Sequence, residues 1–394
     1  MTWASSQQAE RGKTLESLMS SFANWVINRY RSLLLVIGAF GIGVATFIPQ
    51  NVLTENWHLY FDDSFKIRRS FDAINDNFGW LHVLRYSVES DSEGGINDPS
   101  YLAEVERFAE WYDQQPGVVH VARIGQVLKQ LNMNLYGDDP DEYRLPMSAG
   151  LSAQYLLLYE LALPQGLGLD NAINVERSAT QFISYISKTD SEELLKLDVQ
   201  ARRWLAANTS LHAGEATGMD MMFAHINHRN IRSLLKGMVI ALIIISGLLV
   251  VALGSLRLGM LSLITNLAPV GLAYGTWALI NGQIDMSASV VMCMSIGIIV
   301  DDTVHFLSKY QHARRVKGLI GVEAMRYTFN TVGVALAVTT AVLVAGFLVL
   351  TASHFSPTAT TGMLMSITLV FALLVDFLFM PPLLIALDRR WQMT

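Results

Sequence analysis

Charged residues are scarce in this chain of 394 residues, which argues against an ordinary soluble protein. Only 16% of the residues are charged and 52% are hydrophobic, whereas a soluble domain usually carries about 25% charge. The single cysteine, Cys293, excludes a disulfide framework within the chain and a CxxC metal site. We therefore expect a membrane protein, with neither a cofactor nor a metal.

Several functional motifs are also missing. The sequence has no GxxxxGK[ST] phosphate-binding loop, so we do not expect ATP to be its energy source. It has no basic patch with interleaved aromatic residues, which argues against nucleic-acid binding. The polar region shows no nucleophile paired with a base, so we do not expect an enzyme.

The charges that are present fall unevenly along the chain. Residues 50–236 contain 26 acidic and 16 basic residues, whereas the rest of the chain contains 8 acidic and 12 basic residues. Basic residues concentrate on the cytoplasmic side of membrane proteins. The asymmetry thus indicates that residues 50–236 form an extracytoplasmic domain.

The first 31 residues are expected to be a cytoplasmic amphipathic segment. No short apolar run there precedes a small-residue cleavage site, so we expect no cleavable signal peptide. Apolar residues recur at helical spacing: Leu15, Leu18, Met19, Phe22, Trp25 and Val26. They predict a helix over 15–30 that lies at the membrane surface or, alternatively, packs on other protein. The first transmembrane helix is predicted over 32–48, after Arg29 and Arg31.

The domain over 50–236 is predicted to be of the α+β class. Strands are expected at 81–89, 118–123, 179–187 and 211–216. Asp98 and Pro99 are typical of a helix start, so a helix over 99–114 joins the first two strands. A second helix over 191–207 joins the last two. Two βαβ units of this kind form a split sheet with helices on one face.

Two further groups in this region could bind metal but are interpreted otherwise. The acidic turn over 137–142 lacks the spaced ligands of a calcium loop, so we expect a solvated turn. His225 and His228 lie three residues apart on a helix that begins after Gly218, and the sequence supplies no third ligand. We expect both to be surface or interfacial residues.

The remaining transmembrane helices form a five-helix region over 237–385. Spans are predicted at 237–254, 258–280, 286–307, 333–352 and 360–385, followed by a cytoplasmic tail over 386–394. Lys and Arg follow the second, fourth and sixth spans, and the opposite-side connections carry none. The fold class is therefore an α-helical membrane bundle of six spans with both termini in the cytoplasm.

Polar residues inside these spans are the candidate functional site, which we interpret as a proton relay. Asp301, Asp302 and His305 stand in an otherwise apolar segment, where an ionised side chain costs ~2.5–3.5 kcal/mol. His305 is within helical reach of either aspartate. Thr339 and Thr340 could hydrogen-bond these carboxylates or, equally, their own helix. A third acid in the next span, Asp376, could share in transport or act locally at a helix end. A buried polar clamp between helices is the alternative for the whole group.

The chain resembles one half of a resistance-nodulation-division (RND) transporter, in the MMPL-like branch of predicted hydrophobe and lipid exporters. The resemblance rests on LRLGML at 256–261 with NLAP at 266–269, GIIVDDTVHF at 297–306, and Asp376 followed by Pro381 and Pro382. It implies one span, a porter-like extracytoplasmic domain of βαβ units and five more spans. It also implies that Asp301 and Asp302 translocate protons beside Thr339 or Thr340.

The resemblance further implies a transporter driven by the proton-motive force in a bacterial inner membrane, with a large periplasmic domain. Its partners would be membrane lipids and a hydrophobic or amphiphilic substrate. Related transporters carry two halves in one chain, so we expect a homo-oligomer or pairing with a second RND half. The alternatives are a protein-translocation accessory subunit and a lipid- or sterol-sensing membrane domain.

Overall fold

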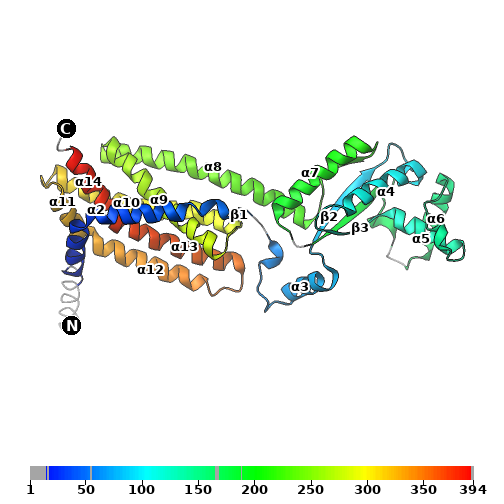
Figure 1. Cartoon of the computed structure of the whole chain (residues 1–394), viewed down its shortest axis with the longest axis horizontal. Coiled ribbons are helices and arrows are strands. Elements are labelled where there is room, and N and C mark those ends of the chain that lie inside the picture. Colours follow the sequence, from blue (N-terminus) through cyan, green and yellow to red (C-terminus); the bar gives the residue numbers. More distant parts are fainter. Residues whose placement is uncertain (1–14, 16, 54–55, 165–167, 188, 392–394) are drawn as a thin grey trace. The chain divides into compact units, whose positions relative to one another are not determined.

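The computed structural model describes residues 15, 17–53, 56–164, 168–187 and 189–391 (Figure 1). The chain divides into two compact units. One, the membrane unit, comprises Met1–Leu53 and Arg229–Thr394, and the other, the polar unit, comprises Thr54–His228.

Six helical segments of the described residues are long and apolar enough to cross a membrane: Tyr30–Gln50, Met219–Leu253, Leu256–Ile280, Met286–Arg315, Gly321–Leu350 and Ser356–Asp388. This number confirms the prediction and makes the chain a multi-pass membrane protein. The first four contain the helices α2 (Tyr30–Ala45), α8 (Met219–Leu253), α9 (Leu256–Ile280) and α10 (Met286–Arg315). The approach helix and second span, predicted separately, form one continuous helix α8, because no proline interrupts them.

The last two spans each contain a π-helical segment. The fifth consists of α11 (Val322–Thr328), the π-helix η6 (Phe329–Gly333) and α12 (Val334–Leu350). The sixth consists of α13 (Ser356–Leu374), the π-helix η7 (Val375–Phe379) and α14 (Met380–Trp391). Residues 386–391 thus continue the last helix, whereas the sequence predicted a tail from residue 386.

Small residues allow helices of the membrane unit to approach closely. Helix α2 contacts α9, and α12 lies beside α13 (Figure 1). A β-carbon placed at Gly275 of α9 would overlap the main-chain oxygen of Val44 in α2. Lipid chains are as apolar as the side chains they meet, so close packing of this kind holds membrane helices together.

The N-terminal helical residues 17–28 pack against the chain's own bundle. Ala23, Val26 and Ile27 are buried in one apolar cluster with Phe306 and Phe329. Leu18 and Trp25, in contrast, remain exposed. One face of this helix therefore packs on protein, which was one of the two predicted alternatives. The opposite face is apolar and exposed.

The polar unit is built on a four-stranded sheet of order β3-β4-β2-β5. Its strands are β2 (His82–Glu89), β3 (Val118–Ala122), β4 (Ala179–Ile186) and β5 (His212–Ala213). Each neighbouring pair is antiparallel, and β2 pairs with β4 along its whole length. Helix α4 (Pro99–Asp113) connects β2 to β3, and α7 (Ser191–Asn208) connects β4 to β5.

Further elements of the polar unit are α3 (Lys66–Phe78), α5 (Ile124–Leu135) and α6 (Ala149–Ala162). Within the membrane unit, the short strand β1 (Val52–Leu53) pairs in parallel with β6 (Gln283–Ile284). The core of the polar unit contains aromatic residues from the sheet and from α4, among them Tyr86, Phe108, Tyr112 and Phe182. Their rings meet edge-on or tilted, an arrangement that aromatic pairs prefer.

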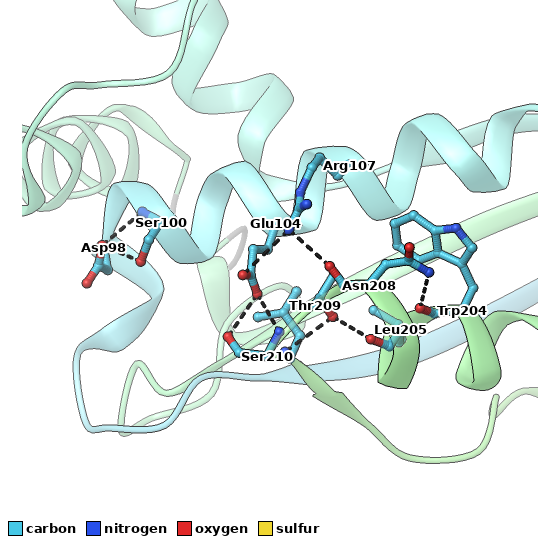
Figure 2. A network of polar contacts seen from close by, with 10 residues as sticks. Asp98, Ser100, Glu104, Arg107, Trp204, Leu205, Asn208, Thr209 and Ser210 are labelled. Atoms are coloured by element: carbon cyan, nitrogen blue, oxygen red, sulfur yellow. Dashed lines mark hydrogen bonds and ion pairs between the residues drawn. The ribbon is translucent and has the colours of Figure 1, made fainter.

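Polar contacts fasten the end of α7 to the side of α4 (Figure 2). The Glu104 carboxylate accepts hydrogen bonds from the main-chain and side-chain donors of Ser210, both at 2.9 Å. Arg107 donates to the main-chain oxygen of Asn208 at 3.2 Å. Asp98 caps α4 by accepting from the main-chain nitrogen of Ser100, as predicted. These contacts hold the two connecting helices together at the turn into β5.

Candidate functional site

Helix α10 carries three of the six residues of the predicted site: Asp301, Asp302 and His305. The Asp285 carboxylate caps its start by accepting a hydrogen bond from the main-chain nitrogen of Ala288 at 2.7 Å, and Arg314 and Arg315 lie in its last turn. Acidic residues at the start of a helix and basic residues at its end complement the helix dipole. Favourable charges at both ends stabilise α10, which is a single helix of 30 residues although two carboxylates lie within it.

The two aspartates of α10 occupy different environments. Asp301 is exposed, with 74% of its side chain accessible, and its Oδ1 lies 3.6 Å from Nε2 of His305, whose side chain is 61% accessible. Asp302 is only partly exposed. The sequence left His305 within reach of either aspartate, and in the structure it lies beside Asp301, one helical turn away.

Asp302 faces a buried polar group formed by neighbouring spans. Its carboxylate lies near that of Asp376 and near the Thr340 hydroxyl. The next residue, Thr303, donates a hydrogen bond to Oδ1 of Asp376 at 3.2 Å. Side chains from α10, α12 and η7 therefore meet within the bundle.

Asp376 is buried, with 2% of its surface accessible. Its Oδ2 has no hydrogen-bond partner among the described residues. The residue lies in the π-helix η7, and single π-turns within α-helices occur frequently at functional sites. Asp376 thus contacts a residue of another span and not only its own helix end.

The two threonines of the fifth span differ. Thr339 is exposed and donates to the main-chain oxygens of Ala335 and Leu336 at 3.0 Å. Thr340 is buried and donates to the oxygen of Leu336 at 2.8 Å. Both hydroxyls thus bond their own helix, as one of the two alternatives predicted. Of the two, Thr340 is the one that approaches Asp302.

Three polar residues of the bundle were not assigned to the site from the sequence. Thr303 is fully buried beside Asp302. Asn266 of α9 is 1% accessible, and neither of its amide atoms has a hydrogen-bond partner among the described residues. Helix α9 runs unbroken past Asn266 and Pro269. The third, Asp388 of α14, accepts hydrogen bonds at 3.1 Å from Tyr310 and from the main chain of Gly321.

Neither His225 and His228 nor the acidic turn belongs to a group of three close ligand atoms in the part of the chain that the structure describes. His225 and His228 are both exposed, as are the described residues 137–141 of the acidic turn. Another grouping, His58, His82 and Asp220 in the polar unit, does present donor atoms close enough to hold an ion. Its members are widely separated in the sequence, so no motif indicated it.

One buried carboxylate of the polar unit, Glu106, is paired with two basic side chains. Burial raises the pKa of Glu106, but the hydrogen bonds and charges of Arg123 and Lys129 outweigh this effect and lower the pKa below its ordinary value. Arg123 donates to both carboxylate oxygens and Lys129 to one, at 2.7–3.2 Å. The cluster joins α4 to α5.

A comparison with protein families matches residues 191–394 to the model of the MMPL family, slightly more than half of the chain. The matched range includes the five spans from α8 onward and every residue of the candidate relay. A search among curated proteins finds no match.

Proposed function

Because the chain belongs to the MMPL family of the RND superfamily, we propose that it is a secondary transporter driven by the proton-motive force. It would export a hydrophobic or amphiphilic compound such as a lipid. Its membrane would be the bacterial inner membrane, with the polar unit in the periplasm as a porter-like domain. Asp301, Asp302, His305, Thr340 and Asp376 would form the proton relay.

The observation that carries this proposal is the group formed by Asp302, Thr303 and Asp376. Two carboxylates and a hydroxyl from different spans converge inside helices that are otherwise apolar. Ionisable residues within membrane spans mark ion and proton pathways in transporters. A clamp with a purely structural role would be expected to satisfy both oxygens of a buried carboxylate, but Oδ2 of Asp376 has no partner among the described residues.

The arrangement suggests how protonation would alter the bundle. If Asp302 and Asp376 are both ionised they repel each other, whereas a protonated carboxyl can donate a hydrogen bond to a neighbouring oxygen. Each transfer would therefore change the contacts of α10 with η7 and α12. The π-turns η6 and η7 interrupt the regular hydrogen bonding of the fifth and sixth spans, where a shift between two packings needs the least rearrangement.

The exposed pair of Asp301 and His305 supports pairing with a second copy or a second RND half. An exposed stripe runs along α10 through Met294, Gly297, Asp301, His305 and Ser308. Charged side chains at the centre of a span avoid lipid because of their desolvation cost. A second polypeptide on this stripe would cover them and complete the relay.

A cysteine at position 297 tests this pairing. In a Cys293→Ser background, Gly297→Cys is expected to form a disulfide between two copies in native membranes, because Gly297 lies on the proposed interface. Leu35→Cys, on an exposed face of α2, is the matched control. If the control crosslinks as well as Gly297→Cys, this stripe is not a self-interface.

An apolar groove in the membrane unit is consistent with a hydrophobic substrate. It encloses about 310 Å³. Residues of α2, α9 and η7 line it, including Gly41, Ala268 and Phe379. Acyl chains and other apolar compounds fit such surfaces without leaving polar groups unpaired.

Dye export by purified protein tests the transport proposal. The full chain is reconstituted in liposomes loaded with the hydrophobic dye N-phenyl-1-naphthylamine, and a pH gradient is imposed. We expect export that a protonophore abolishes and that Asp302→Asn reduces at least tenfold. Export at the same rate without a gradient would contradict proton coupling. Dye binding without any export would favour a sensor, and a secretion defect on deletion without dye sensitivity would favour a translocation accessory.

A further inference from the structure

Two histidines and an aspartate converge in the interior of the polar unit. Oδ1 of Asp220 lies 2.9 Å from Nε2 of His58 and 3.0 Å from Nδ1 of His82. The three facing atoms all lie within 4.8 Å of one another. The accessible surface of the residues is 4% for His58, 3% for His82 and 7% for Asp220, so the group is shielded from solvent.

Each donor comes from a different element. His58 lies on the short 3₁₀-helix η2 (Trp57–Leu59), His82 begins strand β2, and Asp220 is in the first turn of α8. Aromatic rings fix the first imidazole, because His58 contacts Trp57 at 3.9 Å and Phe71 at 4.7 Å between ring centroids. The donors are therefore held by the fold and not by mobile surface side chains.

Outer contacts orient the carboxylate of Asp220. Nε1 of Trp57 donates to Oδ1 at 3.1 Å, and the main-chain nitrogen of Val83 donates to Oδ2 at 3.0 Å. Carboxylates that bind metals are commonly held by such hydrogen bonds, whose loss costs about 10–100-fold in metal affinity. The carboxylate thus has the outer contacts that are common at metal sites.

The chemistry of the donors selects the class of ion. We propose that His58, His82 and Asp220 bind one divalent transition-metal ion, of which Zn²⁺ is the best fit. Zn²⁺ prefers histidine nitrogen and carboxylate oxygen at about 2.0–2.2 Å in a tetrahedral arrangement. Ligand atoms in such a site are about 3.3 Å apart, so each imidazole nitrogen needs to move away from Oδ1 of Asp220 by only a few tenths of an ångström.

Proton placement on the two imidazoles is compatible with this ion. Metal binding requires a lone pair on Nε2 of His58 and on Nδ1 of His82, with each ring proton on the opposite nitrogen. Those opposite nitrogens, Nδ1 of His58 and Nε2 of His82, have no hydrogen-bond partner among the described residues. No described donor occupies them, so each ring can change tautomer as the ion enters.

The position of the cluster in the chain indicates what the ion would do. The chain passes from one unit to the other twice, after Leu53 and after His228. His58 follows the first passage and Asp220 precedes the second, and His82 belongs to the central sheet. A bound ion would fasten both connecting segments to β2.

Zinc binding to the full chain tests this proposal. The protein is purified in mild detergent with a tag that contains no histidine, treated with a chelator and titrated with Zn²⁺ by calorimetry. We expect about one equivalent to bind. His82→Gln and Asp220→Asn are each expected to weaken binding by more than 100-fold, and Trp57→Phe by about 10–100-fold. The double variant His225→Ala/His228→Ala, on the exposed face of α8, is the control and should bind as the wild type does.

Cobalt provides a readout that does not depend on the variants folding. Wild-type protein with one equivalent of Co²⁺ should show the visible absorption of a four-coordinate site, and Zn²⁺ should displace it. Absence of saturable binding in the wild type would overturn the proposal and leave the cluster as a hydrogen-bonded clasp. Binding lost in the control variant but kept in His82→Gln would assign the ion to the exposed histidines instead.

Discussion

Removing the Thr303 hydroxyl should weaken the membrane unit through one contact. Thr303→Val deletes the donor that bonds Oδ1 of Asp376 at 3.2 Å, and both residues are buried. Because Oδ2 of Asp376 has no partner among the described residues, the variant leaves a buried carboxyl without any described hydrogen bond. Such a group costs about 1–3 kcal/mol, which lowers the melting temperature by several degrees.

The matched control is Thr339→Val. It makes the same chemical change at an exposed threonine that bonds only its own helix, so its effect should stay within about 0.5 kcal/mol. Melting in detergent, followed by tryptophan fluorescence, measures both variants. If Thr303→Val melts together with Thr339→Val and the wild type, the contact between Thr303 and Asp376 contributes nothing and our view of the buried group is wrong.

A double variant separates stability from transport. Thr303→Val combined with Asp376→Leu replaces both partners by apolar groups, a change that can be nearly neutral. The double variant should therefore recover most of the lost stability, yet export no dye, because the relay lacks an acid. Recovery of stability together with export would show that Asp376 is only a structural residue.

Two further predictions concern stability. Gly275→Ala places a methyl group against the main-chain oxygen of Val44 and should lower the free energy of unfolding by about 1–3 kcal/mol through overpacking. The control Gly38→Ala has nothing within 4 Å of the added carbon and should not lower the melting temperature. In the polar unit, the lowered pKa of Glu106 contributes stability that is present above its unfolded-state value of about 4.5 and is lost as the pH falls through the folded pKa. Glu106→Gln should therefore destabilise the protein at neutral pH and flatten the fall in melting temperature below about pH 4.5, and an unchanged acid dependence would contradict this assignment.

Local patterns in the sequence located most elements correctly. The strands β2, β3 and β4 begin and end within one residue of their predictions, because alternating apolar residues and flanking turns define them. Asp98 and Pro99 marked the start of α4 for the same local reason. Helices α3 and α5 were not predicted. Strand β5 was predicted over 211–216 but is only two residues long, because only His212 and Ala213 pair with β2.

The sequence did not predict contacts between residues that are far apart in the chain. From its spacing in the sequence, His305 could pair with either Asp301 or Asp302. Only the packing of α10 decides that it pairs with Asp301. Thr303 meets Asp376 across 73 residues of sequence. Such neighbours depend on how whole helices pack, and no local period encodes them.

Proton uptake measured directly is the closest test of the relay. Liposomes containing the full chain and the pH-sensitive dye pyranine are given an acidic exterior, and internal acidification is followed. Our account predicts that Asp301→Asn/Asp302→Asn reduces protein-dependent uptake to the level of empty liposomes. The control Asp91→Asn/Glu93→Gln, at two exposed acids of the polar unit, should match the wild type. Uptake at the wild-type rate in a folded Asp301→Asn/Asp302→Asn protein would contradict the account.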